Sequence, residues 1–164
     1  MSKISPTLWF DGQAEEAANF YLSVFKEGSI DFISRYPDHN PSPAPFKPGD
    51  VLVVEFNLFG QSYQALNGGP DFVPNEAVSL AVGCRDQAEL DRYFDALTAD
   101  GGKPGPCGWV TDKYGFSWQL QPNAVMDLYK SGDAVGIGRM MDAMMTMQKL
   151  DEAKMVAAFK GEKV

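Results

Sequence analysis

The sequence predicts an α+β fold made of two copies of one unit, each containing a strand, a helix and a hairpin. Three observations predict it. The order of strand, helix, strand and hairpin occurs twice within the 164 residues. Both expected helices open on the triplet Gln-Ala-Glu, at residues 13–15 and 87–89. The hexapeptides FGQSYQ at 59–64 and YGFSWQ at 114–119 share the pattern aromatic, Gly, any residue, Ser, aromatic, Gln in the same structural context, which indicates duplication.

The first copy shows the expected signals in order. Residues 4–10 predict a strand, because Thr, Trp and Phe are enriched there and Asp-Gly follows. Residues 13–25 predict a helix whose alanines and aromatic residues recur at the spacing of one buried stripe, with Gly28 as the expected stop. A strand is predicted at 30–36. After a proline-rich loop, residues 51–58 and 61–66 predict a hairpin around Phe59 and Gly60.

The second copy repeats this order and leads into a helical tail. A strand at 77–82 is followed by Asp86, the expected N-cap of a helix at 87–99, and by strands at 107–111 and 116–121. Helices are predicted at 124–130, 137–149 and 151–160. The second of these is dense in methionine, which indicates packing in the core or in a dimer, with a soft lid over a cleft as the alternative.

The predicted domain organisation follows from these elements. A paired βαβββ domain occupies residues 1–122, with modules at about 1–70 and 75–122. Residues 123–164 form a C-terminal helical extension that packs on the domain or on a dimer partner.

Composition and charge exclude several classes of partner. The net charge is −8 and the pI is about 4.5, so phosphate backbones and anionic lipid are repelled; we expect no nucleic-acid and no membrane partner. No run of about 18 apolar residues is present. The first residues lead directly into a strand without a signal-peptide pattern, which predicts a cytoplasmic protein. Two cysteines are too few for a disulfide scaffold.

The supply of metal ligands is small. His39 is the one histidine, and it lies in a proline-dense loop where an ordinary loop residue is expected. Zinc sites generally need several His or Cys ligands at short spacing. The sequence therefore predicts no metal site.

Several segments resemble one known family. They are PTLWFDGQAEEA at 6–17, ALNGGP at 65–70, NE at 75–76, GPCGW at 105–109 and DKYGFSWQLQP at 112–122, and the resemblance extends to QKLD at 148–151 in the tail. The chain resembles the PhnB-like, or demethylubiquinone-methyltransferase-like, family of the glyoxalase/bleomycin-resistance/vicinal oxygen chelate superfamily. The resemblance implies two βαβββ modules that form a cleft, a homodimer, and in most relatives a divalent metal acting as a Lewis acid.

Few of the positions that the resemblance implies for metal ligands hold a suitable residue in this chain. Those of the last strands fall on Gln64 and Gln119, which the internal repeat also pairs. Those of the first strands fall near Ser5, Pro6 or Thr7 and near Ala77 or Ser79, with Glu76 one residue before that window. Neutral amides without imidazole are a poor match for a divalent transition ion. We therefore expect neither a catalytic metal nor another cofactor.

The alternation of strand residues nominates cleft-facing side chains. Gln64 and Gln119 are expected on polar faces, opposite apolar faces that pack under helices. Trp9 lies on the polar face of the first strand, either as a floor for a ligand or as a partly buried packing residue. Glu55 alternates with apolar neighbours and is either an inward-facing lone base or part of a solvated strand face.

Two further residues complete the candidate set. Cys107 lies between small residues. Three roles are open for it: a pocket-lining thiol, an inert packing residue, or a nucleophile, which would need a partner such as Lys113. Asn67 precedes Gly68 and Gly69 and is either a turn residue tolerating positive φ or a donor at the cleft rim. No catalytic residue is assigned.

These residues favour a protein that binds a small organic ligand in a cleft without a catalytic metal. The alternative is a metal-dependent lyase, isomerase or dioxygenase. A methyltransferase is discounted because no Gly-rich strand-to-helix turn for an adenosyl cofactor is present. A purely structural role would leave the cleft filled by side chains.

Overall fold

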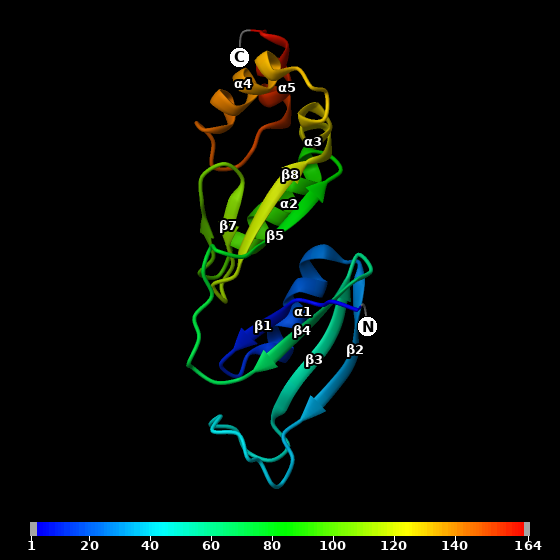
Figure 1. Ribbon diagram of the computed structural model, residues 1–164, viewed down its shortest axis with the longest axis vertical. Coiled ribbons are helices and arrows are strands. Elements are labelled where there is room, and N and C mark those ends of the chain that lie inside the picture. The colour runs from blue at the N-terminus through cyan, green and yellow to red at the C-terminus, as the bar shows by residue number, and fades with distance from the viewer. Residues whose placement is uncertain (1–2, 163–164) are drawn as a thin grey trace. The chain divides into compact units, whose positions relative to one another are not determined.

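The computed structural model describes residues 3–162, and the chain divides into two compact units, Met1–Pro74 and Asn75–Val164 (Figure 1). The first unit contains β1 (Thr7–Phe10), α1 (Ala14–Phe25), β2 (Gly28–Arg35), β3 (Val51–Leu58) and β4 (Gln61–Asn67). The second contains β5 (Ser79–Cys84), α2 (Gln87–Thr98), β6 (Lys103–Pro104), β7 (Trp109–Thr111), β8 (Ser117–Pro122), α3 (Asn123–Tyr129), α4 (Ala134–Met144) and α5 (Glu152–Lys160).

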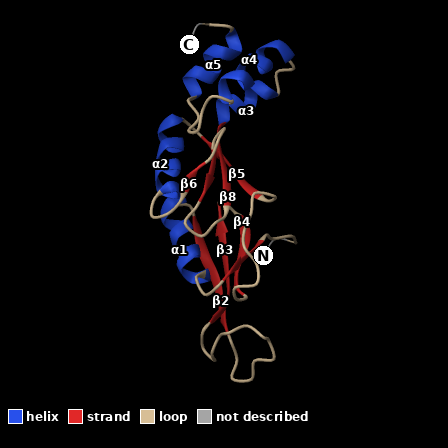
Figure 2. Cartoon of the chain, turned by 90° about the vertical axis from the view of Figure 1, so that its left-hand side faces the viewer, coloured by secondary structure: helices blue, strands red, loops and turns tan. Residues whose placement is uncertain are grey.

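The two units share one sheet topology. The strand order is β1-β4-β3-β2 in the first sheet and β5-β8-β7-β6 in the second. In each sheet the first strand runs parallel to the last, and the remaining pairs are antiparallel. One helix, α1 or α2, covers one face of its own sheet (Figure 2). The α+β fold of two βαβββ modules with C-terminal helices, predicted from the duplication, is confirmed.

The period of the apolar residues explains how each helix meets its sheet. The apolar stripe of α1 is buried, from Ala14 to Phe25, and in β3 the side chains of Val54, Phe56 and Leu58 are buried while their neighbours are half-buried. A stripe of period 3.6 packed on a strand face of period 2 forms one continuous core. The other face of the sheet carries Glu55 and Gln64 together with apolar residues such as Val53.

The turns that precede the two last strands use different chemistry. Phe59 and Gly60 both have positive φ, at 50° and 79°, as a two-residue hairpin turn requires. In the second unit Gly115 has φ of 91°, and the buried carboxylate of Asp112 accepts hydrogen bonds from the backbone N–H groups of Tyr114 and Phe116. The aromatic-Gly repeat therefore marks the same place in both sheets.

Several predicted boundaries differ from the structure: the first strand begins at Thr7, the strand predicted at 107–111 begins at Trp109, and β6 was not predicted. The helix α1 ends at Phe25, as predicted, but its cap is Lys26, whose φ is 58°, and Gly28 instead begins β2. A Cβ on Gly28 would lie 2.0 Å from the carbonyl oxygen of Asn57, so only glycine permits this close strand pairing. The methionine-rich helix spans 134–144 instead of 137–149, because the Asp133 carboxylate accepts from the N–H groups of Val135 and Gly136 and caps it earlier.

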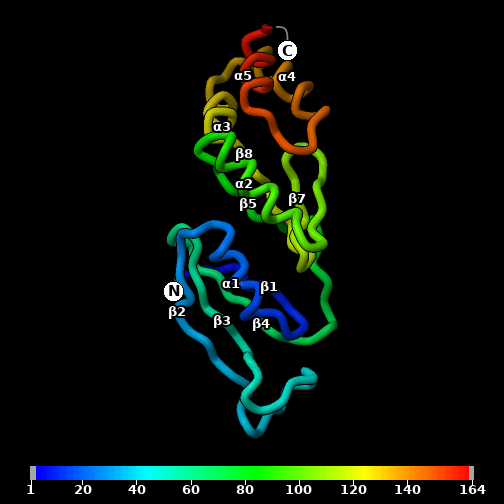
Figure 3. The backbone as a smooth tube through the Cα atoms, turned by 180° about the vertical axis from the view of Figure 1, so that it is seen from behind, coloured from blue at the N-terminus to red at the C-terminus, as the bar shows by residue number. Residues whose placement is uncertain are grey.

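The three C-terminal helices form one group. Contacts join α4 to α5, α3 to α5, and α3 to β8, so within the second unit the extension packs on the sheet (Figure 3). The segment after α4 is held by the loop before β7: the N–H groups of Cys107 and Gly108 donate to the carbonyl oxygens of Met147 and Gln148. Among residues 3–162, no helix is long and apolar enough to cross a bilayer.

Carboxylate side chains cap two helices of the second unit. Asp86, the predicted cap of α2, accepts from the N–H of Glu89, and Asp151 accepts from the N–H of Lys154 at the start of α5. These backbone hydrogen bonds lower the pKa of both carboxyls. A depressed folded-state pKa adds stability above the unfolded value, near 3.9, and that stability is lost as the pH falls through the folded value.

We therefore expect the free energy of unfolding to decline as the pH falls below about 4, and to decline less steeply in Asp151→Asn. Urea unfolding at a series of pH values measures this slope. Asp142→Asn, at an exposed position of α4, is the control and should keep the wild-type slope. An Asp151→Asn slope identical to that of wild type would show that the cap of α5 does not contribute.

Candidate functional site

The polar face of the second sheet carries a chain of hydrogen bonds. Trp118 and Leu120 of β8 are buried, and Gln119 and Gln121 alternate with them on the opposite face. Gln119 Nε2 donates to Ser79 Oγ at 2.7 Å, and Gln121 Nε2 donates to Gln119 Oε1 at 3.2 Å. These hydrogen bonds connect the first and last strands of this sheet and orient the side-chain amides of Gln119 and Gln121.

The first unit has a similar arrangement on its own sheet. Thr7 Oγ1 donates to Gln64 Oε1 at 3.0 Å, and Gln64 Nε2 lies 3.4 Å from Glu55 Oε1. Glu55 and Gln64 are direct partners in the ladder, so their side chains share a face. The predicted residues Glu55 and Gln64 thus lie together, and a hydroxyl of the first strand meets a glutamine of the last strand in both units.

A cavity of about 180 Å³ lies in the second unit between the polar sheet face and the C-terminal helices. Its polar lining consists of Cys107, Gln119, Gln121 and Tyr129. Its apolar lining consists of Trp109, Val125, Met126, Met144, Leu150 and Met155. The structure therefore brings two of the predicted site residues, Cys107 and Gln119, to one cavity, together with side chains of the extension.

Cys107 occupies a constrained position in the loop before β7. Its φ is 58°, in the left-handed region, and its Sγ lies 3.5 Å from Met145 Sδ. The partner considered from sequence, Lys113, lies in the β7–β8 turn with its Nζ 5.1 Å from the centre of the Tyr114 ring, and it does not line the cavity. This arrangement matches a pocket-lining thiol better than a nucleophile paired with a cation.

Tyr129 closes the cavity from α3. Its hydroxyl donates to Met144 Sδ at 3.8 Å. Burial raises the pKa of Tyr129, and the nearby Cys107 side chain adds to the rise, so the phenol group is neutral at pH 7. No Asp, Glu, Lys, Arg or His belongs to the described lining. The described cavity lining is therefore polar at its floor but includes no charged side chain.

The other two predicted residues have structural contacts in the first unit. Trp9 Nε1 donates to the Gly69 carbonyl at 2.7 Å, and its ring meets Phe72 edge to face at 4.8 Å. Asn67 is buried in β4; its Oδ1 accepts from the N–H of Ala14 at the start of α1, and its Nδ2 donates to the Val51 carbonyl. Asn67 therefore does not join the polar face that holds Gln64, and it has no positive φ.

The donor groups of each polar face do not suit a divalent metal. They are mostly amides and hydroxyls that hydrogen-bond to one another, and the nearest carboxylates, Glu55 and Asp31, each accept from an amide. His39 is exposed in the proline-rich loop. Within residues 3–162, no three His, Cys, Asp or Glu side chains gather in a way that could hold a metal ion. These residues do not fit the superfamily's usual metal centre.

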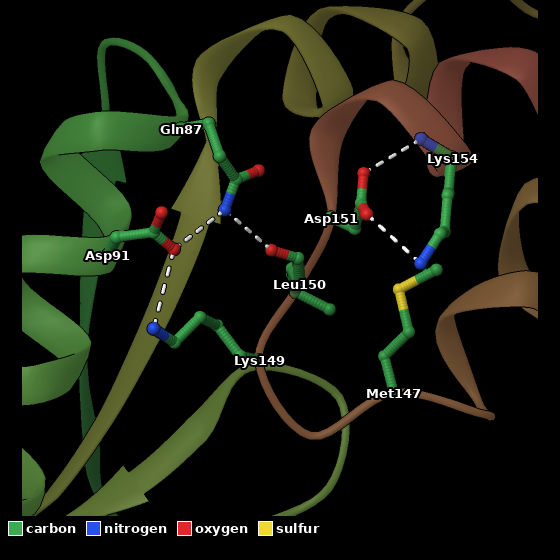
Figure 4. Close-up of a pocket in the computed structure, with 7 residues that line it drawn as sticks. All are labelled: Gln87, Asp91, Met147, Lys149, Leu150, Asp151 and Lys154. Carbon is green, nitrogen blue, oxygen red and sulfur yellow. Dashed lines mark hydrogen bonds and ion pairs between the residues drawn. The ribbon is translucent and has the colours of Figure 1, made fainter.

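A second, more open pocket of about 360 Å³ lies where the extension returns to α2 (Figure 4). At its centre Gln87 Nε2 donates to the Leu150 carbonyl and to Asp91 Oδ1, both at 3.0 Å, while Gln87 Oε1 accepts from the N–H of Glu152 at 2.8 Å. Lys149 Nζ lies 3.4 Å from the same Asp91 oxygen. This Gln87 clamp fixes the start of α5, whose Met155 lines the smaller cavity.

Comparison with known proteins decides the family. A profile described as 3-demethylubiquinone-9 3-methyltransferase matches residues 2–121. The chain belongs to this family. The match to the 3-demethylubiquinone-9 3-methyltransferase family ends at Gln121, so α3, α4 and α5 lie beyond it, although the resemblance seen in the sequence extended into the tail. No curated protein matches the chain.

Solved structures of similar proteins support the family and the fold. A PhnB protein from Bacillus cereus is 36% identical, with 74% of this chain and 99% of that chain covered and a TM-score of 0.61. PA1353 from Pseudomonas aeruginosa is 22% identical, covering 74% and 98%, with a TM-score of 0.58. The fosfomycin resistance protein FosX from Listeria monocytogenes, solved with Mn(II) and sulfate, is 14% identical, covering 74% and 90%, with a TM-score of 0.50. This member of the 3-demethylubiquinone-9 3-methyltransferase family therefore has the fold of the vicinal oxygen chelate superfamily.

Proposed function

We propose that the protein binds a small organic molecule, without a catalytic metal, in the cavity between the second sheet and the C-terminal helices. One observation carries the proposal: Gln119 and Gln121 are held by hydrogen bonds at the polar floor of a cavity whose other walls are aromatic, aliphatic and thioether side chains. An apolar cavity with a few convergent polar groups is the usual form of a small-molecule site.

The size of the cavity limits the ligand. An engineered apolar cavity of about 150 Å³ encloses benzene, whereas sites for drug-sized ligands measure roughly 300–1,000 Å³. At about 180 Å³ this cavity suits a single ring with one small substituent. It is too small to enclose an adenosyl cofactor, which supports reading the family's methyltransferase label as nominal for this chain.

A metal-dependent lyase, isomerase or dioxygenase is the alternative function. FosX, a structural relative, was solved with Mn(II), but the likeness at 14% identity concerns the fold. Gln119 and Gln64 replace the charged ligands that the superfamily resemblance implies at these positions. No observation on this chain favours the alternative over simple binding.

Filling the cavity should abolish binding. We expect Met144→Trp to lower the affinity for toluene at least about 10-fold, because the larger ring occupies the ligand's volume; this equals about 1.4 kcal/mol of binding free energy. Isothermal titration calorimetry measures the affinity. Met141→Trp is the matched control, since Met141 lies on the same helix but is 44% exposed and does not line the cavity.

The control variant should bind toluene as the wild type does. Equal affinities of Met144→Trp and wild type would contradict the proposed site, and so would a wild-type protein that binds no single-ring compound. The homodimer and the cytoplasmic location expected from the sequence stay predictions; light scattering after size-exclusion chromatography tests the dimer.

A further inference from the structure

We infer that the cavity selects a neutral aromatic ring that carries a hydrogen-bond donor, the chemistry of a phenol. The inference rests on the proposed function, because it concerns the same cavity. Three properties of the lining carry it: the absence of charged side chains from the described lining, the direction of the hydrogen bonds along the polar floor, and the sulfur-rich wall.

The lining excludes charged ligands. An ion moved out of water without a partner loses several kcal/mol or more of hydration free energy, and the described lining offers no Asp, Glu, Lys, Arg or His as a counter-charge. Tyr129 cannot supply an anion near neutral pH, because burial raises its pKa above the ordinary value. A carboxylate such as benzoate and an ammonium such as benzylammonium are therefore both disfavoured.

The hydrogen bonds of the floor run in one direction. Gln119 donates to Ser79, and Gln121 donates to Gln119, so Gln121 stands at the donor end of the series and its own carbonyl oxygen is not used in it. Among the described residues no hydrogen bond to Gln121 Oε1 is found, although Gln121 lines the cavity. An amide oxygen accepts hydrogen bonds and cannot donate them. The matching group on a ligand is therefore an O–H or N–H.

The wall opposite this floor favours an aromatic ring. Met126, Met144 and Met155 bring three thioethers to the lining, and the indole ring of Trp109 lies on the sheet face next to its ladder partner Gln119. Thioether sulfur makes favourable contacts with aromatic rings, and aromatic rings also interact with each other through edge-to-face and offset stacking. An aromatic ring gains from both contacts, whereas a saturated ring of similar volume gains only from burial.

Calorimetric titration of the full chain with phenol, anisole, toluene, cyclohexanol and benzoate tests the inference. We expect phenol to bind about 10-fold more tightly than toluene or anisole, because neither of these donates to the Gln121 carbonyl. Cyclohexanol should bind more weakly than phenol, and benzoate should show no binding. Gln121→Met should reduce the affinity for phenol to that for toluene while toluene binding persists. Gln148→Met, at an exposed position of the extension, should keep the wild-type preference.

The outcomes separate this inference from the proposed function. Equal binding of phenol, anisole and toluene would overturn the donor preference while leaving the binding cavity intact. Tighter binding of benzoate than phenol, of cyclohexanol than phenol, or an unchanged phenol preference in Gln121→Met would also overturn the inference. Failure of all the compounds to bind would instead contradict the proposed function itself.

Discussion

Replacing Asp112 with alanine should lower the free energy of unfolding by about 3–5 kcal/mol, the loss typical of removing a buried charged partner. The residue is 2% exposed. Its Oδ1 accepts from the N–H groups of Tyr114 and Phe116, and its Oδ2 accepts from Trp118 Nε1 at 2.8 Å. Alanine would leave these three donors without the carboxylate in a half-buried turn, directly before the strand that carries Gln119.

The internal repeat supplies the control for this substitution. Asn57 stands two residues before the aromatic-Gly pair of the first unit, as Asp112 does in the second. Its side chain bonds at the surface to Ser29 and Asp31, so Asn57→Ala should cost less than about 1 kcal/mol. Urea denaturation of both variants measures the difference. Losses of similar size would contradict a special role for the buried carboxylate.

Replacing Gln87 with alanine should release the extension and open the cavity. The Leu150 carbonyl and the Glu152 N–H would lose their partner at the start of α5, which costs about 1–3 kcal/mol locally because partly buried groups lose a hydrogen bond that water replaces incompletely. Since Leu150 and Met155 line the cavity, the affinity for phenol should fall more than about 10-fold.

Gln13→Ala is the matched control, because Gln13 opens the Gln-Ala-Glu triplet of the first unit but is exposed and makes no capping bond with its side chain. Hydrogen exchange of the amides at 150–160, together with calorimetry, measures both effects. Protection that stays at the wild-type level in Gln87→Ala would show that the Gln87 clamp does not hold α5.

The duplication and the faces of the strands could be predicted from sequence because both depend on short-range periodicity. Alternation placed Gln119 opposite Trp118, as found, but it left open whether Glu55 faces inward, and only the structure pairs Glu55 with Gln64 on one face. The N-cap at Asp86 could be predicted because an aspartate stands directly before the apolar stripe of α2. Boundaries set by tertiary contacts were missed: Gly28 belongs to a strand because the Asn57 carbonyl lies so close.

The walls of the cavity could be predicted only in part. Cys107 and Gln119 lie on the repeated domain and were nominated, whereas Tyr129 and Met144 belong to the extension and were not. Their placement depends on where the chain folds back after Pro122, which spacing along the sequence does not specify. The family match ends at Gln121 and thus carries no information about these helices. The density of methionine in the extension did indicate a role for it, because a lid over a cleft was the alternative to packing in the core or in a dimer.

Methionine methyl NMR tests the central claim most directly. With ¹³C-methyl labels on all eight methionines, addition of phenol should shift the signals of the three that line the cavity, Met126, Met144 and Met155, through the ring current of the bound ligand. The signal of the exposed Met141 should remain in place. Shifts confined to Met141, or no shift at the three lining methionines at saturating phenol, would contradict a ligand site beneath the C-terminal helices.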